Sequence, residues 1–322
     1  MGHITEIDGI SIGHVTDEEH HTGISAVVFS REMPLGVDVR GGAPGTRETD
    51  VFNPLNLVET ADAVVLCGGS AYGLTAASGV MKYLKEKGRG IETGYGKVPI
   101  VPGAVIFDLP VTGGYVPPTE ELVSWGYSAA ESASEKGTSV GNVGAGAGAT
   151  VGKIYGMDYA VKSGIGSAVV EGAGGLKAGA IAAVNPLGDV IDPVTGKVIA
   201  GVRSPDKKGF ADARKLIRSI LFPFAPPISS TIVALVAVNG NFSKVDMNRI
   251  ARMAHDGIAR AVYPSHTMMD GDTVFAAAAG GDLGYVDVTV AGALAAEAMS
   301  LSILDAVRSA VTIEGYPSIA DV

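Results

Sequence analysis

Residues 229–238 read Ser-Ser-Thr-Ile-Val-Ala-Leu-Val-Ala-Val, so hydroxyl residues lead directly into an unbroken apolar run. A short apolar run of this kind predicts a strand that is buried on both faces. The Pro-rich segment Phe-Pro-Phe-Ala-Pro-Pro at 222–227 precedes it and predicts an exposed linker, because proline disrupts regular structure. Thr231 therefore opens a core strand directly after a segment in which the chain can be cut.

A pair of carboxylates, Asp270-Gly271-Asp272, arrives later in the chain on another segment. A threonine with a free α-amine carries its own general base, so a cut between Ser230 and Thr231 would create a nucleophile and its base in one residue. A threonine that opens a strand and an Asp-Gly-Asp turn are each common when taken singly. Their combination with the Pro-rich segment raises the hypothesis of a precursor that matures by cleaving itself.

The composition indicates a globular protein with a large core. The 322 residues are 47% hydrophobic and 18% charged, which argues against disorder. The net charge of −10 argues against binding to nucleic acid or to an anionic membrane, because both favour clustered Lys and Arg. Cys67 is the single cysteine, so no disulfide can form within the chain. With no signal-peptide pattern and no long uncharged apolar stretch, we expect a soluble cytoplasmic protein.

Strands and helices are expected in clusters rather than in strict alternation. Hydrophobic periodicity and turn residues predict strands within 4–29 and at 63–66, 99–109, 165–171, 178–185, 231–238, 274–279 and 286–290. The same signals predict helices at 71–87, 119–136, within 201–220, and at 243–262 and 291–310. This arrangement is typical of an α+β layered sandwich.

A glycine-rich stretch at 141–153 invites comparison with phosphate-binding loops. The P-loop pattern needs Gly at 147 and Ser or Thr at 154, where the chain has Ala147 and Ile154. The dinucleotide fingerprint is matched only loosely, and no clear strand leads into it. We therefore expect no nucleotide cofactor and favour a pocket wall, in which backbone N–H groups and Lys153 are available to an oxyanion or a carboxylate.

Two further groups have ordinary structural explanations. The turn Cys67-Gly68-Gly69-Ser70 lacks the Gly-x-Ser-x-Gly pattern of a nucleophile elbow, so a tight turn with a buried cysteine is favoured over catalysis. The histidines form no HExxH or other compact metal-binding pattern, so we expect no metal. His266, which precedes Asp270 by four residues, is favoured as a turn histidine whose hydrogen bonds are satisfied.

Several segments spread over most of the chain together match one family. They are Arg-Gly-Gly-Ala-Pro-Gly-Thr-Arg-Glu-Thr-Asp at 40–50, Gly-Gly-Ser-Ala-Tyr-Gly-Leu at 68–74, Val-Ile-Phe-Asp-Leu at 105–109, Gly-Ala-Gly-Ala-Gly-Ala-Thr at 144–150, Lys-Ser-Gly-Ile-Gly-Ser at 162–167, Ala-Val-Asn at 183–185, Ala-His-Asp-Gly-Ile-Ala-Arg at 254–260 and Asp-Gly-Asp-Thr-Val-Phe-Ala at 270–276. On these segments the chain resembles the S58 peptidases, which are self-processing N-terminal-nucleophile hydrolases. The family includes L-aminopeptidase D-Ala-esterase/amidase, the β-peptidyl aminopeptidases and the nylon-oligomer hydrolase.

The resemblance implies an αββα sandwich, with residues 1–322 as a single domain. It also implies autocleavage into an α subunit, 1–230, and a β subunit, 231–322, and a homo-oligomer that is often a tetramer of αβ units. The scissile pair of the family is usually Asn-Thr or Gly-Ser, and placement without a gap puts it at Ser230-Thr231. A one-residue insertion would move it to Ser229-Ser230 and make Ser230 the alternative nucleophile.

The resemblance further implies roles for individual residues. Thr231 is the expected nucleophile, and Asp270 and Asp272 are the polar partners that orient it and its amine. Lys153 and Asn185 fall near the residues of the family that stabilise the oxyanion and position the substrate.

Two positions depart from the family pattern. Ser230 stands where Asn or Gly usually precedes the nucleophile. Phe107 stands where several relatives carry a tyrosine near the oxyanion, so one hydrogen-bond donor is expected to be missing.

The activity implied by the resemblance is hydrolysis of small peptides, amides or esters that carry a free amine, without cofactor or metal. Aminopeptidase, β-peptide, D-amino-acid amide and oligoamide specificities share these motifs. Two alternatives remain open from the residues alone. One is an acyltransferase like the similarly folded ornithine acetyltransferases, and the other is an unprocessed, non-catalytic oligomeric scaffold.

Overall fold

An 18-residue strand holds two sheets together. The computed structural model describes residues 2–219 and 230–322, and in it both sheets share β2 (Thr22–Val39). The first part of β2 pairs with β1 (Ile10–Asp17) and β4 (Thr60–Cys67), and its last part pairs with β16 (Thr273–Ala278). The strand passes from one sheet to the other after Pro34.

The remaining strands extend each sheet or form small sheets beside them. The first sheet continues through β7 (Gly103–Val105) and β3 (Thr46–Arg47), and the second contains β10 (Ile165–Glu171), β11 (Lys177–Asn185) and β14 (Thr231–Val238). The small sheets are β5 (Ile91–Glu92) with β6 (Lys97–Val98), β8 (Thr150–Val151) with β9 (Val161–Lys162), and β12 (Asp189–Ile191) with β13 (Val198–Ala200) and β15 (Val262–Tyr263).

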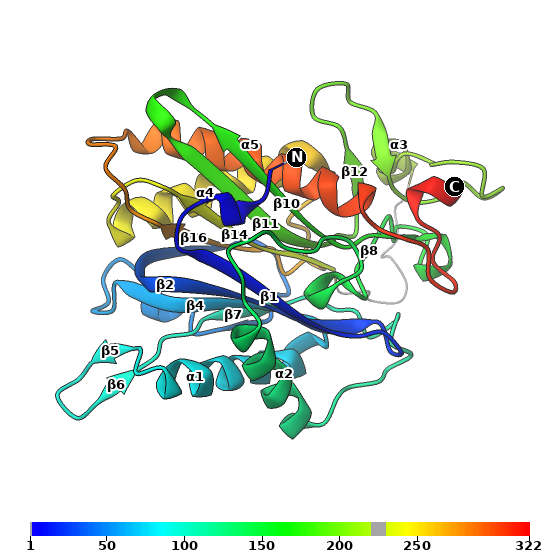
Figure 1. Cartoon of the computed structure of the whole chain (residues 1–322). Helices are drawn as coiled ribbons and strands as arrows, with labels where there is room; N and C mark the ends of the chain where they lie inside the picture. Colours follow the sequence, from blue (N-terminus) through cyan, green and yellow to red (C-terminus); the bar gives the residue numbers. More distant parts are fainter. Residues whose placement is uncertain (1, 220–229) are drawn as a thin grey trace.

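Helices cover the outer face of each sheet. The helices α1 (Ala76–Glu86) and α2 (Thr119–Glu131) pack on the first sheet, and α4 (Lys244–Ala261) and α5 (Val288–Arg308) pack on the second (Figure 1). One apolar core lies between the two sheets, and one lies between each sheet and its helices. The expected α+β class and αββα sandwich are thereby confirmed.

The apolar run of β14 is explained by its place in the middle of the second sheet. Ile232, Ala234 and Val236 face α4 and α5, whereas Val233 and Leu235 face the other sheet. A strand covered on both faces needs apolar residues at every position, because successive side chains point to opposite faces. By the same alternation Thr231, at the start of the strand, is on the face that points between the two sheets.

A crossover through α4 places the beginnings of β14 and β16 side by side. The two strands are parallel, with Val233 opposite Thr273. Parallel strands begin at the same edge of a sheet, so Thr231 lies beside Gly271, although the two residues are far apart in the chain. Ser243 caps α4, because its side chain accepts a hydrogen bond from the backbone N–H of Asp246.

Some expected elements are absent or shorter. The helix expected within 201–220 is reduced to α3 (Ala213–Leu216) and a 3-10 turn. The strand expected at 286–290 is wrong, because Asp287 caps α5 and accepts a hydrogen bond from Thr289 N at 2.7 Å. The strand expected at 99–109 is regular only in β7. The Pro-rich segment at 222–227 lies outside the described residues.

The helix α5 is a core helix despite its hydropathy. It has 21 residues and a mean hydropathy of 1.6, so by length and composition it could cross a membrane. However, 67% of its apolar window is buried against the rest of the protein. A helix that is apolar on most sides is expected when a sheet and another helix cover it. Here β10, β11 and α4 cover α5.

The inter-sheet core predicts a large difference between two leucine variants. Leu235 is fully buried between the sheets, and Leu57 is 94% exposed. Leu235→Ala is expected to lower the free energy of unfolding by about 2–5 kcal/mol, because it leaves a cavity. Leu57→Ala should change it by less than about 0.5 kcal/mol. Urea denaturation followed by circular dichroism measures both, and equal effects would contradict the assignment of this core.

Candidate functional site

The peptide bond between Ser230 and Thr231 is held from both sides at the edge of the second sheet. Ser230 N donates to Met269 O at 2.8 Å, and Gly271 N donates to Ser230 O at 2.8 Å. Thr231 Oγ1 also donates to Ser230 O, at 2.5 Å. Both Ser230 and Thr231 are buried. The hydroxyl of Thr231 therefore already contacts the carbonyl group that it would have to attack in self-cleavage.

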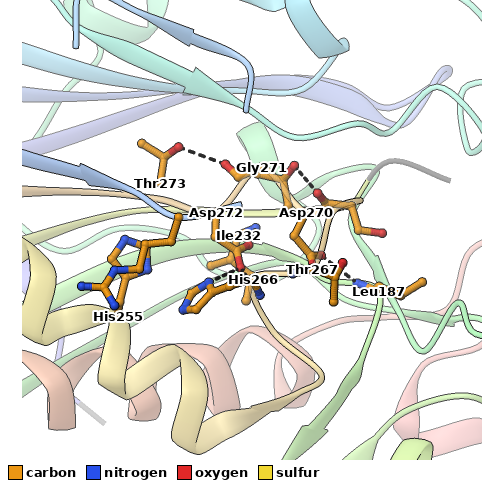
Figure 2. A network of polar contacts seen from close by, with 12 residues as sticks. Leu187, Ile232, His255, His266, Thr267, Asp270, Gly271, Asp272 and Thr273 are labelled. Carbon is orange, nitrogen blue, oxygen red and sulfur yellow. Dashed lines mark hydrogen bonds and ion pairs between the residues drawn. The ribbon is translucent and has the colours of Figure 1, made fainter. Parts of the chain in front are cut away.

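Asp272 is fixed beside this bond by the start of β14. Its Oδ1 accepts from Ile232 N at 2.8 Å, one residue past Thr231. Its Oδ2 accepts from His266 N at 3.1 Å and from His266 Nδ1 at 2.7 Å (Figure 2). The carboxylate is buried, and these three donors compensate for the water that it has lost.

Asp270 lies on the other side of Gly271 and is held by a separate set of donors. Its Oδ2 accepts from Thr267 N at 2.8 Å and Thr267 Oγ1 at 2.6 Å, and its Oδ1 from Leu187 N at 3.4 Å (Figure 2). Burial and the nearby charge of Asp272 raise the pKa of Asp270 above its usual range. A buried carboxyl of raised pKa is a stronger base than an exposed one, which is typical of functional sites.

The structure adds two histidines to this network. His266 contacts Asp272 directly, and its ring lies 4.9 Å from that of His255 in an edge-to-face arrangement (Figure 2). His255 Nε2 donates to Asp38 O at 3.0 Å. Burial lowers the pKa of His255 to about 4, so this ring is neutral near pH 7. A satisfied turn histidine was the prediction for His266. Its nearness to Asp270 in sequence was the available signal that it belongs to the site.

Lys153 and Asn185 form one unit next to Thr231. Asn185 is directly opposite Thr231 in the pairing of β11 with β14, and its side chain shares the inter-sheet face by strand alternation. Lys153 Nζ donates to Asn185 O at 2.8 Å and Asn185 Oδ1 at 2.6 Å. Asn185 Nδ2 donates to Phe107 O at 3.0 Å. Burial lowers the pKa of Lys153 to about 7, partly opposed by Asp270 and Asp108.

The glycine-rich segment packs against this unit of Asn185 and Lys153. Residues 144–151 are buried, and the backbone N–H groups of Ala147 and Ala149 donate to carbonyls within the segment. Thr150 N donates to Asn185 Oδ1 at 3.0 Å. The expectation of exposed N–H groups is therefore wrong for these residues, because the loop packs inside the sandwich. The segment fixes the orientation of the Asn185 amide.

A cavity of about 110 Å³ opens beside Thr231. It is lined by Ala43, Pro44, Gly45, Ser70, Val105, Ile106, Phe107 and Thr231. Ser70 reaches this wall from a left-handed backbone conformation with φ of 55°. Cys67 of the same turn is fully buried, and burial raises the pKa of its thiol, as expected for a structural cysteine.

The five expected site residues thus meet at one edge of the sandwich. Thr231 and Asn185 come from the strands β14 and β11, Lys153 from the segment after β8, and Asp270 and Asp272 from the segment before β16. A hydroxyl, two buried carboxylates, an amide and a lysine in such contact can carry out nucleophilic attack on a carbonyl. Within residues 2–219 and 230–322, no group of His, Cys, Asp and Glu has the arrangement of a metal site.

The contact between His266 and Asp272 predicts that His266 positions the carboxylate. His266→Ala is expected to lower kcat/KM by about tenfold or more, because the carboxylate loses a charge-assisted donor. His266→Asn, whose amide can replace Nδ1–H, should recover most of the activity. His20→Ala removes a comparable His–Asp pair, with Asp17, outside the site and serves as the control. Equal loss in both alanine variants would contradict the role.

Comparisons with known proteins agree with this geometry. The model of peptidase family S58 matches residues 2–319. An uncharacterized aminopeptidase of Mycobacterium tuberculosis is 40% identical, over 100% of this chain and 98% of its own length. A 6-aminohexanoate-oligomer endohydrolase of Kocuria sp. is 30% identical, over 94% of this chain and 85% of its own length.

Solved structures show the same fold at lower identity. A β-aminopeptidase of Burkholderia sp. superposes with a TM-score of 0.70 at 18% identity, over 97% of this chain and 88% of its own. The L-aminopeptidase D-Ala-esterase/amidase of Ochrobactrum anthropi gives a TM-score of 0.66 at 16% identity, over 96% and 86%. Its structure is described as a variant of the Ntn hydrolase fold. On the family match and these relatives, the chain belongs to peptidase family S58 and is an amide hydrolase.

Proposed function

We propose that this amide hydrolase matures by cleaving its own Ser230-Thr231 bond and then uses Thr231 as its N-terminal nucleophile. The observation that carries the proposal is the contact at the bond itself. Thr231 Oγ1 lies 2.5 Å from Ser230 O, and Gly271 N–H lies 2.8 Å from the same oxygen. Thr231 also lines the cavity, whereas Ser230 is not among the described lining residues, which favours Thr231 over Ser230 as nucleophile. Ser229, which the alternative cut involves, lies outside the described residues.

Self-cleavage proceeds through an ester. Thr231 Oγ attacks the Ser230 carbonyl carbon, and Gly271 N–H stabilises the charge that forms on the carbonyl oxygen. The C–N bond then breaks, the hydroxyl proton passes to the departing nitrogen, and Ser230 remains as an ester on Thr231 Oγ. Water hydrolyses the ester, which leaves a carboxylate on Ser230 and a free amine on Thr231.

In the mature enzyme the new amine is the general base for the hydroxyl of the same residue. In this proposal both carboxylates orient the amine. The support is that Asp272 accepts from the backbone next to Thr231 and that Asp270 lies beside Gly271. In this proposal Asn185 and Lys153 stabilise the oxyanion of the substrate. The support is that Asn185 is opposite Thr231 in the pairing of β11 with β14, and that Lys153 contacts Asn185.

The substrates that fit this proposal are small peptides, amides or esters with a free amine. The support is the aminopeptidase name of the mycobacterial relative and the small cavity beside Thr231. The oligoamide named for the Kocuria relative is a neighbouring class with the same amide bond. Assembly into a homo-oligomer, a tetramer of αβ units, is part of the same proposal.

Self-cleavage is tested by the intact mass of freshly purified protein. The wild-type chain is expected to give the fragments 1–230 and 231–322, and Thr231→Ala should stay intact because it lacks the hydroxyl. Ser230→Ala keeps the carbonyl group and should still be cleaved at the same bond. Cleavage one residue earlier would transfer the role to Ser230. An intact wild-type chain that is also inactive would favour the scaffold, and acyl exchange to an added amine without free acid would favour an acyltransferase.

The pKa of Lys153 predicts a pH dependence. As pH rises through about 7, the ammonium loses its proton and stabilises an oxyanion less well, so kcat/KM of the wild type should fall there. Lys153→Met is expected to lower kcat by about 10²–10³ and to remove this limb of the profile. Lys136→Met, at an exposed position, is the matched control. A Lys153→Met enzyme that keeps the wild-type profile would exclude this role.

A further inference from the structure

Ser230 occupies a site that is built for one residue of an extended chain. Its N–H donates to Met269 O and its carbonyl accepts from Gly271 N–H, both at 2.8 Å, so Ser230 forms a parallel bridge with Asp270. The residue is fully buried. Its hydroxyl has no hydrogen-bond partner among the described residues. The site therefore selects the Ser230 side chain by its small size, and the hydroxyl adds no hydrogen bond to these residues.

The ester of self-cleavage and the acyl-enzyme of catalysis are the same kind of molecule. In each, an acyl group is esterified to Thr231 Oγ beside the free amine of Thr231. In the first the acyl group is Ser230, and in the second it comes from the substrate. In each, water adds to the ester carbonyl, the C–Oγ bond breaks, and the products are a free carboxylate and the Thr231 hydroxyl. This identity rests on the self-cleavage proposed above.

We propose that Ser230 marks the acyl subsite, so that the acyl residue of a substrate takes the place that Ser230 holds before cleavage. In this pose the substrate nitrogen donates to Met269 O, and the substrate carbonyl accepts from Gly271 N–H. Gly271 N–H is then an oxyanion donor in both reactions. The cavity of about 110 Å³ on the inter-sheet side of Thr231 receives the leaving amine.

The geometry at Gly271 explains how the backbone comes so close to the reacting atoms. A Cβ at this position would lie 2.7 Å from Ala43 O and 2.9 Å from Thr231 Oγ1. Contacts of that length do not occur at real side chains, so only glycine leaves room for the hydroxyl and the acyl group. The loop at 40–43 fixes the backbone next to Gly271, because Ala43 N donates to Asp270 O at 2.9 Å.

The pose defines a class of acyl group. An α-aminoacyl group has its N–H and its C=O on one residue, as Ser230 has, and can make both backbone hydrogen bonds. A β-aminoacyl group has an extra methylene between its N–H and its C=O. It can therefore make only one of the two hydrogen bonds, to Met269 O or from Gly271 N–H, in this site. Ser230 is fully buried, so we expect a side chain larger than serine to be accommodated less well in its place. The structure thus favours small α-aminoacyl groups such as glycyl, alanyl and seryl.

Two matched series test the proposal. In the first, Ser230 is replaced by Gly, Ala, Val and Leu, and the rate of self-cleavage is followed by mass in cell-free translation. In the second, the mature wild-type enzyme hydrolyses glycyl, alanyl, seryl, valyl, leucyl and β-alanyl p-nitroanilides, so that the leaving amine is constant. Both series should rank the acyl side chains in the same order. The leucyl and β-alanyl compounds should be slower than the seryl compound by roughly tenfold or more.

A third experiment distinguishes the cavity for the leaving amine from the acyl subsite. Phe107→Leu enlarges the cavity and is expected to change the preference between large and small leaving amines, while the order of acyl groups stays the same. A change in the order of acyl groups instead would place the acyl residue in the cavity and overturn the proposal.

The outcomes separate this proposal from the proposed function. Cleavage and hydrolysis that both depend on Thr231, but rank the acyl groups differently, would overturn the shared subsite alone. A leucyl anilide hydrolysed as fast as the alanyl one would overturn it as well, and this holds even if Ser230→Leu fails to fold. If the wild-type chain stays intact, hydrolyses none of the anilides and behaves like Thr231→Ala, the self-processing mechanism is overturned instead.

Discussion

The parallel pairing of β14 with β16 is the constraint on which the site depends. Because α4 carries the chain back across the sheet, both strands begin at the same edge, and the register places residue 231 beside residue 271. Asp270 and Asp272 therefore come to lie next to Thr231 through backbone geometry alone. The antiparallel pairing of β11 with β14 then adds Asn185 from the other side. A slip of one residue in either pairing would turn Thr231 away from the inter-sheet face.

The second constraint is that most polar groups of the site are buried and must be satisfied there. Asp270 and Asp272 together accept from backbone N–H groups, a threonine hydroxyl and a histidine. Burial, together with the nearby charge of Asp272, raises the pKa of Asp270. Lys153 donates to the carbonyl and amide oxygens of Asn185. Lys162 similarly donates to backbone carbonyls of the glycine-rich segment, and burial lowers its pKa to about 7. Such a network orients its members tightly, because each unsatisfied group would be costly in a low dielectric.

The sequence predicted the parts of the fold that have a strong local signal. The strand at 231–238 and the capped helix from Ser243 were found with nearly the observed bounds, because an unbroken apolar run and a capping serine are local features. The helix expected within 201–220 is present but short, because the helical signal there extends only over α3 and a 3-10 turn. The sharing of β2 by two sheets was not predicted, because periodicity does not show which strands pair.

The sequence predicted the side chains of the candidate site but not its backbone hydrogen-bond donors and acceptors. Residue types and family motifs pointed to Thr231, Asp270, Asp272, Lys153 and Asn185, and the structure brings these residues together. The role of His266 depends on a left-handed turn that aims its ring at Asp272, which the sequence alone does not show. The donor at Gly271 and the acceptor at Met269 are backbone groups, so the residue types at these positions do not predict them.

In the mechanism proposed above, the hydroxyl of Thr231 carries out two reactions, and only the second has the amine as its base. Before cleavage the nitrogen of Thr231 is an amide and cannot accept a proton, so the amine that serves the mature enzyme does not yet exist. The hydroxyl proton instead points at Ser230 O, the carbonyl group under attack. It must turn away before Oγ can act as a nucleophile. A chain needs this step only once, so it can be slow. In this scheme cleavage then supplies an amine on Thr231 itself, which can serve as the base in every later turnover.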